Sequence, residues 1–268
     1  MLTARMAGYA TGPEDGPAVV LIHGFPLNRH MWEAQEASLA EAGYRVILPD
    51  LRGHGKTPPV PGVATMDLMA KDVLRLLDTL GVTSFVAVGH SMGGYVALAL
   101  HRVAPDRIRG LVLANTRADA DDAKGRDTRD ALARRLESEG IDVLVATMVP
   151  KMLADRSLQG RPDVRPTVEA MVRQTPVDGA VNALMGMKER PDATPQLETI
   201  HVPTLLVAGS EDPITPPGGM EAMAASIADS TLHVIEATAH LSSLEDPDAF
   251  NGALLNWLRR VVPTKGPD

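Results

Sequence analysis

Six short segments of the chain are made almost entirely of apolar residues that follow one another without interruption. A strand buried on both faces of a parallel sheet shows such a continuous run, whereas a half-exposed strand alternates apolar and polar positions. Residues 4–10 leave room for one further strand ahead of these segments. The pattern predicts buried strands over residues 18–22, 45–48, 85–88, 108–114, 204–207 and 232–235.

Segments with helical spacing lie between these strands. In residues 66–80 apolar side chains recur three and four positions apart, and Gly81 follows as a residue suited to a helix C-terminus. Residues 91–103 are apolar on nearly every side, which predicts a buried helix, and further helices are expected over 32–42 and 249–261. Strands that alternate with helices build βαβ units, so we predict an α/β fold with a doubly wound, mostly parallel sheet.

The alternation stops between residues 116 and 195, where no convincing strand is found. We therefore predict a small helical cap over residues 117–195, inserted before the last two strands, and an α/β core made of residues 1–116 and 196–268. Five of the 13 methionines lie in this cap. Two roles fit them: packing beneath the cap, or an adaptable apolar lining for a substrate pocket. Apolar segments with helical spacing occupy residues 132–136, 143–148, 168–171 and 181–187.

Composition narrows the range of functions. The net charge is −8 and no run of Lys and Arg is present, so a nucleic acid partner is not expected. The chain has no cysteine, which excludes disulfides and thiolate metal sites. No apolar run approaches the ~18 residues that span a bilayer, and residues 1–16 lack the pattern of a signal peptide. We expect a cytoplasmic protein, a monomer or a homodimer, with no membrane partner.

The strongest chemical signal is the segment GHSMGG at residues 89–94, between a predicted strand and a predicted helix. It matches G-x-S-x-G, in which a sharp strand-to-helix turn exposes the serine oxygen at the carboxyl edge of the sheet. Glycines two positions before and after the serine avoid clashes, because glycine has no Cβ. The helix N-terminus adds partial positive charge beside a developing oxyanion. Ser91 is therefore the candidate nucleophile, and a glycine-rich turn with an incidental capping serine is the alternative.

A second loop, HGFP at residues 23–26, directly follows the predicted strand over residues 18–22. In a doubly wound topology this loop faces the turn at Ser91, and Gly24 lets the two backbones approach closely. The N–H groups of Phe25 and Met92 could then bind an oxyanion together. A plain strand-to-helix turn is the alternative interpretation.

A candidate acid follows the predicted strand over residues 204–207. Asp212 lies in the segment GSEDP, where a carboxylate could orient a histidine and stabilise its imidazolium. Glu211 competes for this role. We favour Asp212 because it lies one step further along the loop and is followed by Pro213, although an ordinary turn aspartate remains the alternative.

His240 is the favoured base among eight histidines. Only His240 lies after both the last predicted strand and the candidate acid, which gives the chain order serine, aspartate, histidine that accompanies this nucleophile motif. We expect His23, His54 and His90, in loops near Ser91, to be structural. The others lie within or beside predicted helices and strands: His30, His101, His201 and His233.

Together these segments resemble the α/β-hydrolase superfamily over nearly the whole chain. The segment DLRGHG at residues 50–55 is similar to a structural loop of that family. HGFPLN at residues 23–28, with Met31 and Trp32, and AHLSSLE at residues 239–245 look most like a small bacterial branch. That branch holds carboxylesterases, aryl esterases with perhydrolase side activity, and 3-oxoadipate enol-lactonases. Ser91 excludes the members with an aspartate nucleophile, which are epoxide hydrolases and dehalogenases.

The motifs and the resemblance imply a serine esterase that works through an acyl-enzyme, needs no metal or organic cofactor, and takes a small-molecule ester or lactone. The small apolar cap favours short to medium acyl or aryl esters. It contains no Trp, Phe or Tyr, so it offers no clear handle for a dicarboxylate lactone. Lactonase, perhydrolase and C–C bond hydrolase are the enzymatic alternatives. A slow-turnover ligand sensor is the alternative from another class, because a fold does not fix a function.

Overall fold

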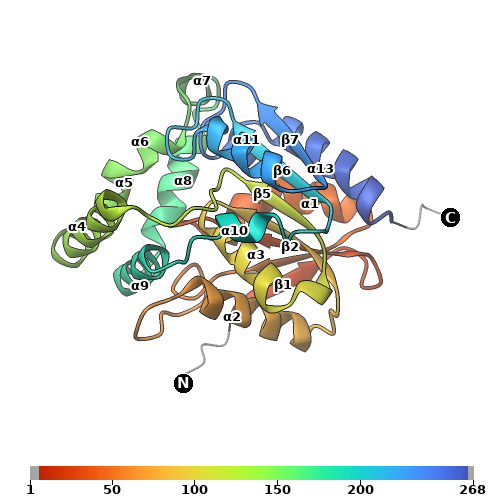
Figure 1. Cartoon of the computed structure of the whole chain (residues 1–268). Coiled ribbons are helices and arrows are strands. Elements are labelled where there is room, and N and C mark those ends of the chain that lie inside the picture. The colour runs from red at the N-terminus through yellow and green to blue at the C-terminus, as the bar shows by residue number, and fades with distance from the viewer. Residues whose placement is uncertain (1–5, 265–268) are drawn as a thin grey trace.

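Seven strands form one central sheet in the computed structural model, which describes residues 6–264 (Figure 1). The strand order is β1-β3-β2-β4-β5-β6-β7. β1 pairs with β3 in antiparallel fashion, and all other neighbours are parallel. The strands are β1 (Gly8–Thr11), β2 (Ala18–Ile22), β3 (Arg45–Pro49), β4 (Phe85–His90), β5 (Ile108–Ala114), β6 (Thr204–Gly209) and β7 (Ser230–Ile235).

All six predicted strands are present, and five of them are mostly buried. The strand predicted over 232–235 is not buried: it is the last strand of the sheet, and only Ile235 in it is fully buried. β2 and β5 have the predicted bounds, and the other four extend the predicted segments by one or two residues. Every residue of β4 and β6 is buried, as expected of a strand covered on both faces. β1 overlaps the space left for a strand over residues 4–10, of which residues 4 and 5 lie outside the described part of the chain.

The connections between strands decide which helix covers which face. The connection from β2 to β3 runs through α1 (Glu33–Glu41) and moves the chain toward the β1 end of the sheet. The connection from β3 to β4 runs through α2 (Met66–Thr79) and moves it in the opposite direction, past β2. Right-handed crossovers place these helices on opposite faces. α3 (Met92–Val103) packs against α2, and α13 (Pro247–Val261) packs against α1 (Figure 1). The direction reverses between β2 and β4, and ligands bind at such a reversal in doubly wound sheets.

The predicted helical insertion lies between β5 and β6, before the last two strands, and all of its helices except the last gather on one side of the sheet (Figure 1). The sequence pattern located parts of the longer helices and the six-residue helix Asp142–Thr147, but the other short helices and α11 (Pro217–Ser226) were not predicted. The inserted helices are α4 (Ala123–Glu139), α5 (Asp142–Thr147), α6 (Val149–Met152), α7 (Asp155–Gly160), α8 (Val164–Arg173), α9 (Val177–Lys188) and α10 (Thr194–Leu197).

The five methionines of the cap contribute to packing. Met152, Met171 and Met187 are buried, and Met148 and Met185 are partly buried against the same hydrophobic core. These contacts favour the packing role over an adaptable lining for a pocket.

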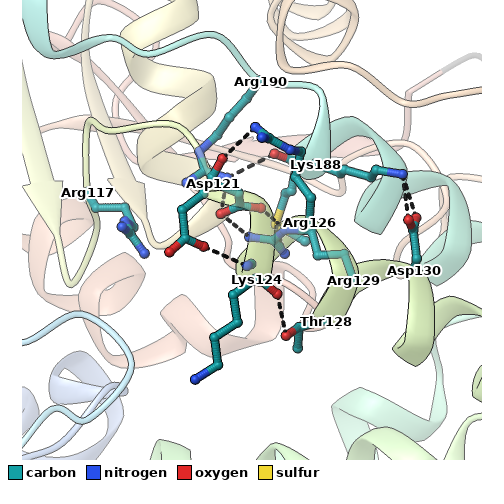
Figure 2. Close-up of polar contacts among 12 residues, drawn as sticks. Arg117, Asp121, Lys124, Arg126, Thr128, Arg129, Asp130, Lys188 and Arg190 are labelled. Atoms are coloured by element: carbon teal, nitrogen blue, oxygen red, sulfur yellow. Dashed lines mark hydrogen bonds and ion pairs between the residues drawn. The ribbon is translucent and has the colours of Figure 1, made fainter.

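Charged residues fix the base of the cap (Figure 2). Asp121, just before α4, pairs with Arg129 of α4 and with Arg190, which follows α9. Arg190 lies 2.8 Å from Asp121 and also stacks over the ring of Tyr95 in α3, 4.3 Å from the ring centre. The two ends of the insertion are therefore tied to each other and to the helix that follows Ser91.

Candidate active site

Ser91 occupies the turn between β4 and α3 in a backbone conformation that is rare for residues other than glycine, with φ 51° and ψ −114°. Its N–H donates to the carbonyl of Ala114 at 2.9 Å, and its carbonyl accepts from Thr116 Oγ1 at 2.8 Å. The end of β5 thus holds the strained residue in place. The helix begins at Met92, one residue later than predicted, because the dihedral angles of Ser91 are not helical.

The glycines around Ser91 are required by close approach of neighbouring backbone. A Cβ on Gly89 would overlap the carbonyl of Gly93, and a Cβ on Gly93 would overlap a carbonyl at the end of β2. A Cβ on Gly24 would lie only 2.6 Å from Cδ2 of His90. The turn at Ser91 therefore packs directly against β2 and the loop that follows it.

The two predicted oxyanion donors lie at the ends of adjacent strands, β2 and β4. The N–H of Leu27 donates to the carbonyl of Gly24 at 2.9 Å and closes a turn over residues 24–27. The N–H of Phe25, inside this turn, takes no part in that hydrogen bond. Met92 is the first residue of α3, so its N–H has no acceptor within the helix. Both N–H groups therefore remain candidates for binding an oxyanion.

Asp212 is a buried carboxylate that accepts hydrogen bonds on both oxygens. Oδ1 accepts from the N–H groups of Ile214 at 2.8 Å and Thr215 at 3.0 Å. Oδ2 accepts from Thr215 Oγ1 at 2.5 Å, from Asn115 Nδ2 at 2.9 Å and from His240 Nδ1 at 2.8 Å. Burial alone would raise the pKa of this carboxyl, but the bonds from His240, Thr215 and Asn115 outweigh it and hold the pKa well below the usual range.

His240 is buried and contacts the predicted acid, with Nδ1 located 2.8 Å from Oδ2 of Asp212. Because a carboxylate accepts at Nδ1, the neutral ring carries its proton there and leaves Nε2 as an acceptor. The ring centre of His240 lies 4.9 Å from that of His90, the residue before Ser91. Glu211, the competing acid, is exposed. The strand order thus brings Ser91, Asp212 and His240 to one edge of the sheet.

Three further histidines are buried around this edge: His23, His54 and His90. Nδ1 of His23 donates to the carbonyl of the next residue at 2.9 Å, and its Nε2 accepts from the N–H of Leu51 at 2.9 Å. Nδ1 of His54 donates to the carbonyl of Arg52 at 3.0 Å. Burial lowers the pKa of all three rings, that of His54 to about 3, so they are neutral structural groups.

Stability should therefore fall in mild acid. The unfolded chain protonates a histidine below about pH 6.5, whereas folded His54 does so only near a pKa of about 3. Between these values the unfolded state binds the extra proton, and His54 alone removes about 1.4 kcal/mol of unfolding free energy per pH unit. Denaturant titrations from pH 7 to pH 4 measure this slope.

The comparison variant is His54→Gln, which should show a slope smaller by about 1.4 kcal/mol per pH unit. His233→Gln, at an exposed position of β7, serves as the matched control and should keep the wild-type slope. Equal slopes in all three proteins would show that the buried ring of His54 is not the source.

Glu245 is a buried carboxylate whose structural role was not predicted. Its Oε1 accepts from the N–H of Ala239 at 2.8 Å, next to His240. Its Oε2 accepts from the N–H of Ala154 at 2.7 Å and from Ser157 Oγ of α7 at 2.6 Å. Burial raises the pKa of this carboxyl. One side chain therefore joins the histidine loop to the cap, through contacts that no local sequence pattern reveals.

Within residues 6–264, no three or more His, Asp or Glu side chains gather in a way that could hold a metal ion. In the same range, no helix combines the length and apolar character needed to cross a membrane.

Comparison with known proteins gives matches over most of the chain. The family model for the alpha/beta hydrolase fold matches residues 17–247. The 3-oxoadipate enol-lactonase 2 of Acinetobacter baylyi is 31% identical over 255 residues, which cover 94% of this chain and 92% of that protein.

Solved structures match equally broadly. A malate-bound thermophilic esterase from Thermogutta terrifontis superposes with a TM-score of 0.94 at 40% identity, over 97% of this chain and 94% of that one. The enol-lactonase from Burkholderia xenovorans LB400 gives 0.89 at 26% identity, over 95% and 96%. These matches include the helical insertion as well as the sheet, and they confirm the predicted fold class.

Proposed function

The chain belongs to the α/β-hydrolase family, in the branch of small bacterial esterases and enol-lactonases, and from this we propose that it is a serine hydrolase of carboxylic esters. The family assignment supports a hydrolase, and the proposal adds the triad and the substrate class. The observation that carries it is the 2.8 Å bond between Asp212 and His240, at the sheet edge where Ser91 is held in a strained turn. An aspartate so placed fixes the tautomer that can take a proton from serine.

In the proposed reaction, His240 removes the proton from Ser91 Oγ as that oxygen attacks the ester carbonyl. The N–H groups of Phe25 and Met92 bind the oxyanion, and the start of α3 adds partial positive charge. His240 then protonates the leaving alcohol, and the acyl group stays on Ser91. Water, deprotonated by His240, attacks the acyl carbon, and the acid leaves as His240 returns the proton to Ser91 Oγ. Asp212 remains ionised throughout, in keeping with its low pKa, and stabilises the imidazolium.

We propose short to medium acyl or aryl esters as substrates. The Thermogutta terrifontis esterase shares 40% of its aligned residues with this chain, against 31% for the Acinetobacter baylyi enol-lactonase, which supports an ester ahead of a lactone. Lactone hydrolysis is the second candidate, because that enol-lactonase matches over 94% of the chain.

The test is a turnover count on a matched panel. The wild-type protein is mixed with p-nitrophenyl esters from acetate to dodecanoate, an aryl acetate, an enol-lactone, and acetate with peroxide. Many product molecules per protein, with the best rates on short or medium esters, would support the proposal. Release of one product molecule per protein molecule, with no further turnover, would indicate a ligand sensor. A clear preference for the enol-lactone would favour the second candidate, and a dodecanoate optimum would contradict the proposed chain length.

Gly24→Ala tests the proposed oxyanion loop. The added Cβ would lie 2.6 Å from Cδ2 of His90, so it pushes the loop that carries Phe25 away from the turn at Ser91. We expect kcat on the best ester to fall by about 10²–10³, the cost of a lost oxyanion donor.

The matched control is Gly252→Ala in α13, where an added Cβ meets no atom within 4 Å. This change should leave kcat unaltered and stabilise the protein by about 0.5–1 kcal/mol, since alanine is the better helix former. Steady-state kinetics and thermal unfolding of both variants give the comparison. A Gly24→Ala protein with wild-type kcat would place the oxyanion donors elsewhere.

A further inference from the structure

Asn115 is the first residue after β5, between the strand ends that carry Ser91 and Asp212. It is fully buried, and its φ of 43° lies in the left-handed region, which asparagine tolerates better than most residues. Its N–H donates to the carbonyl of Val207 in β6 at 2.8 Å. The backbone is therefore pinned between two strands, which fixes the direction in which the side chain leaves it.

Both polar atoms of the Asn115 side chain have partners around the candidate triad. Nδ2 donates to Oδ2 of Asp212 at 2.9 Å and to the carbonyl of Ala239 at 3.1 Å. Oδ1 accepts from Ser242 Oγ at 2.6 Å. Ala239 and Ser242 lie on either side of His240 in the chain. One buried amide therefore joins the acid to both flanks of the histidine.

The chemistry of the amide group fits this position. The carboxylate of Asp212 and the carbonyl of Ala239 are both acceptors and need hydrogen-bond donors. The hydroxyl of Ser242 donates and needs an acceptor. A primary amide supplies two donor hydrogens and an acceptor oxygen. An ionised carboxylate at the same place would offer no donor and would set a second negative charge beside Asp212.

We propose that Asn115 is a positioning residue of the triad, which holds Asp212 and the His240 loop at one fixed spacing. This inference rests on the proposed function and deepens it. Asn115 acts through the acid and the histidine and does not touch the substrate. Loss of the Asn115 side chain displaces Nε2 of His240 relative to Ser91, while the cap and the substrate-binding surfaces are unchanged. We therefore expect kcat to fall and KM to stay the same.

Two variants separate positioning from a general role in folding. Asn115→Gly accepts the left-handed backbone and removes the amide, whereas Asn115→Asp keeps the shape and replaces the donors by an acceptor. We expect kcat to fall by about 10² in each, the cost of a small misplacement of a reacting group, with KM little changed.

The pH profile gives a readout that a purely structural role would not move. The titratable groups around position 115 and the His240 loop are Asp212, His240, His90 and Glu245, whose Oε1 accepts from the N–H of Ala239. In Asn115→Asp two buried carboxylates are in contact, which raises the pKa at which the pair loses its last proton. Where both are ionised, the second negative charge stabilises the imidazolium, so the acidic limb of kcat/KM should move to higher pH. Asn115→Gly adds no charge and should show the smaller movement.

The matched control is Asn182→Asp in α9. Nδ2 of Asn182 donates to the carbonyl of Val60 at 3.0 Å, so the same chemical change breaks a similar bond away from the acid. It should lower the melting temperature and leave kcat and the acidic limb unaltered. The rate at which a fluorophosphonate labels Ser91 is a second readout. Labelling requires an activated serine, but it does not require that the natural substrate be known.

Slow labelling, low kcat and a shifted acidic limb in the Asn115 variants would support the positioning role. Wild-type kcat and labelling in both variants, with only a lower melting temperature, would overturn it and leave the serine hydrolase intact. A wild-type protein that neither labels at Ser91 nor turns over any ester would instead overturn the proposed function, and the role of Asn115 would fall with it.

Discussion

Replacement of Ser91 by alanine should lower kcat on the best ester by about 10⁶, because the acyl-enzyme can no longer form. The remaining rate above that of water comes from substrate binding and the oxyanion donors, about 10³–10⁴ over the uncatalysed reaction. Alanine keeps the Cβ of serine, so it places no new atom in the tight turn and experiences the same backbone strain at φ 51°. The melting temperature should stay near that of the wild type.

Steady-state hydrolysis and intact-mass labelling with a fluorophosphonate measure this effect. Ser138→Ala, at an exposed position of α4, is the matched control and should keep full activity and full labelling. If Ser91→Ala were as active as the wild type, the turn at Ser91 would be a scaffold feature. The sensor interpretation would then become the leading hypothesis.

The second large effect is expected for Asp212→Asn, with kcat lowered by about 10⁴. An asparagine can turn its NH₂ group toward Nδ1 of His240, which then becomes an acceptor and places the proton on Nε2. The ring is left in the tautomer that cannot accept a proton from Ser91. The amide also loses the negative charge that stabilises the imidazolium.

Glu211→Gln separates the two neighbouring acids. Glu211 is exposed, so its loss should leave kcat unchanged, whereas Asp212→Asn removes a carboxylate bonded to His240 at 2.8 Å. The reverse result would assign the acid to Glu211. A double variant of Ser91→Ala and Asp212→Asn should be no slower than Ser91→Ala alone, because residues that act as a unit are not additive.

The histidines show how far a local pattern reaches. Chain order alone selected His240 from eight candidates, and it is the one that contacts Asp212. The three histidines expected to be structural are buried and neutral. The sequence could not show that Nε2 of His23 accepts from the N–H of Leu51, because that partner lies 28 positions away in the chain.

Asn115 and Glu245 mark where the sequence stops being informative. An asparagine directly after a buried strand is a signal for a left-handed residue, since asparagine is enriched there. Its contact with Asp212 spans 97 positions, and the contact of Glu245 with Ala154 spans 91. The residues next to Asn115 and Glu245 in the sequence do not indicate whether their side chains face solvent or join distant loops.

The sequence by itself determined the positions of the strands, their alternation with helices and the strand-to-helix turn at Ser91. These features depend on the burial of short segments and on the φ that a glycine-flanked turn requires, both of which are properties of neighbouring residues. The tertiary structure alone decided the start of α3, the packing of the cap methionines and the network that joins Asp212, His240 and Asn115. Those depend on which distant strand ends meet at one edge, and that meeting is set by the packing of the whole sheet.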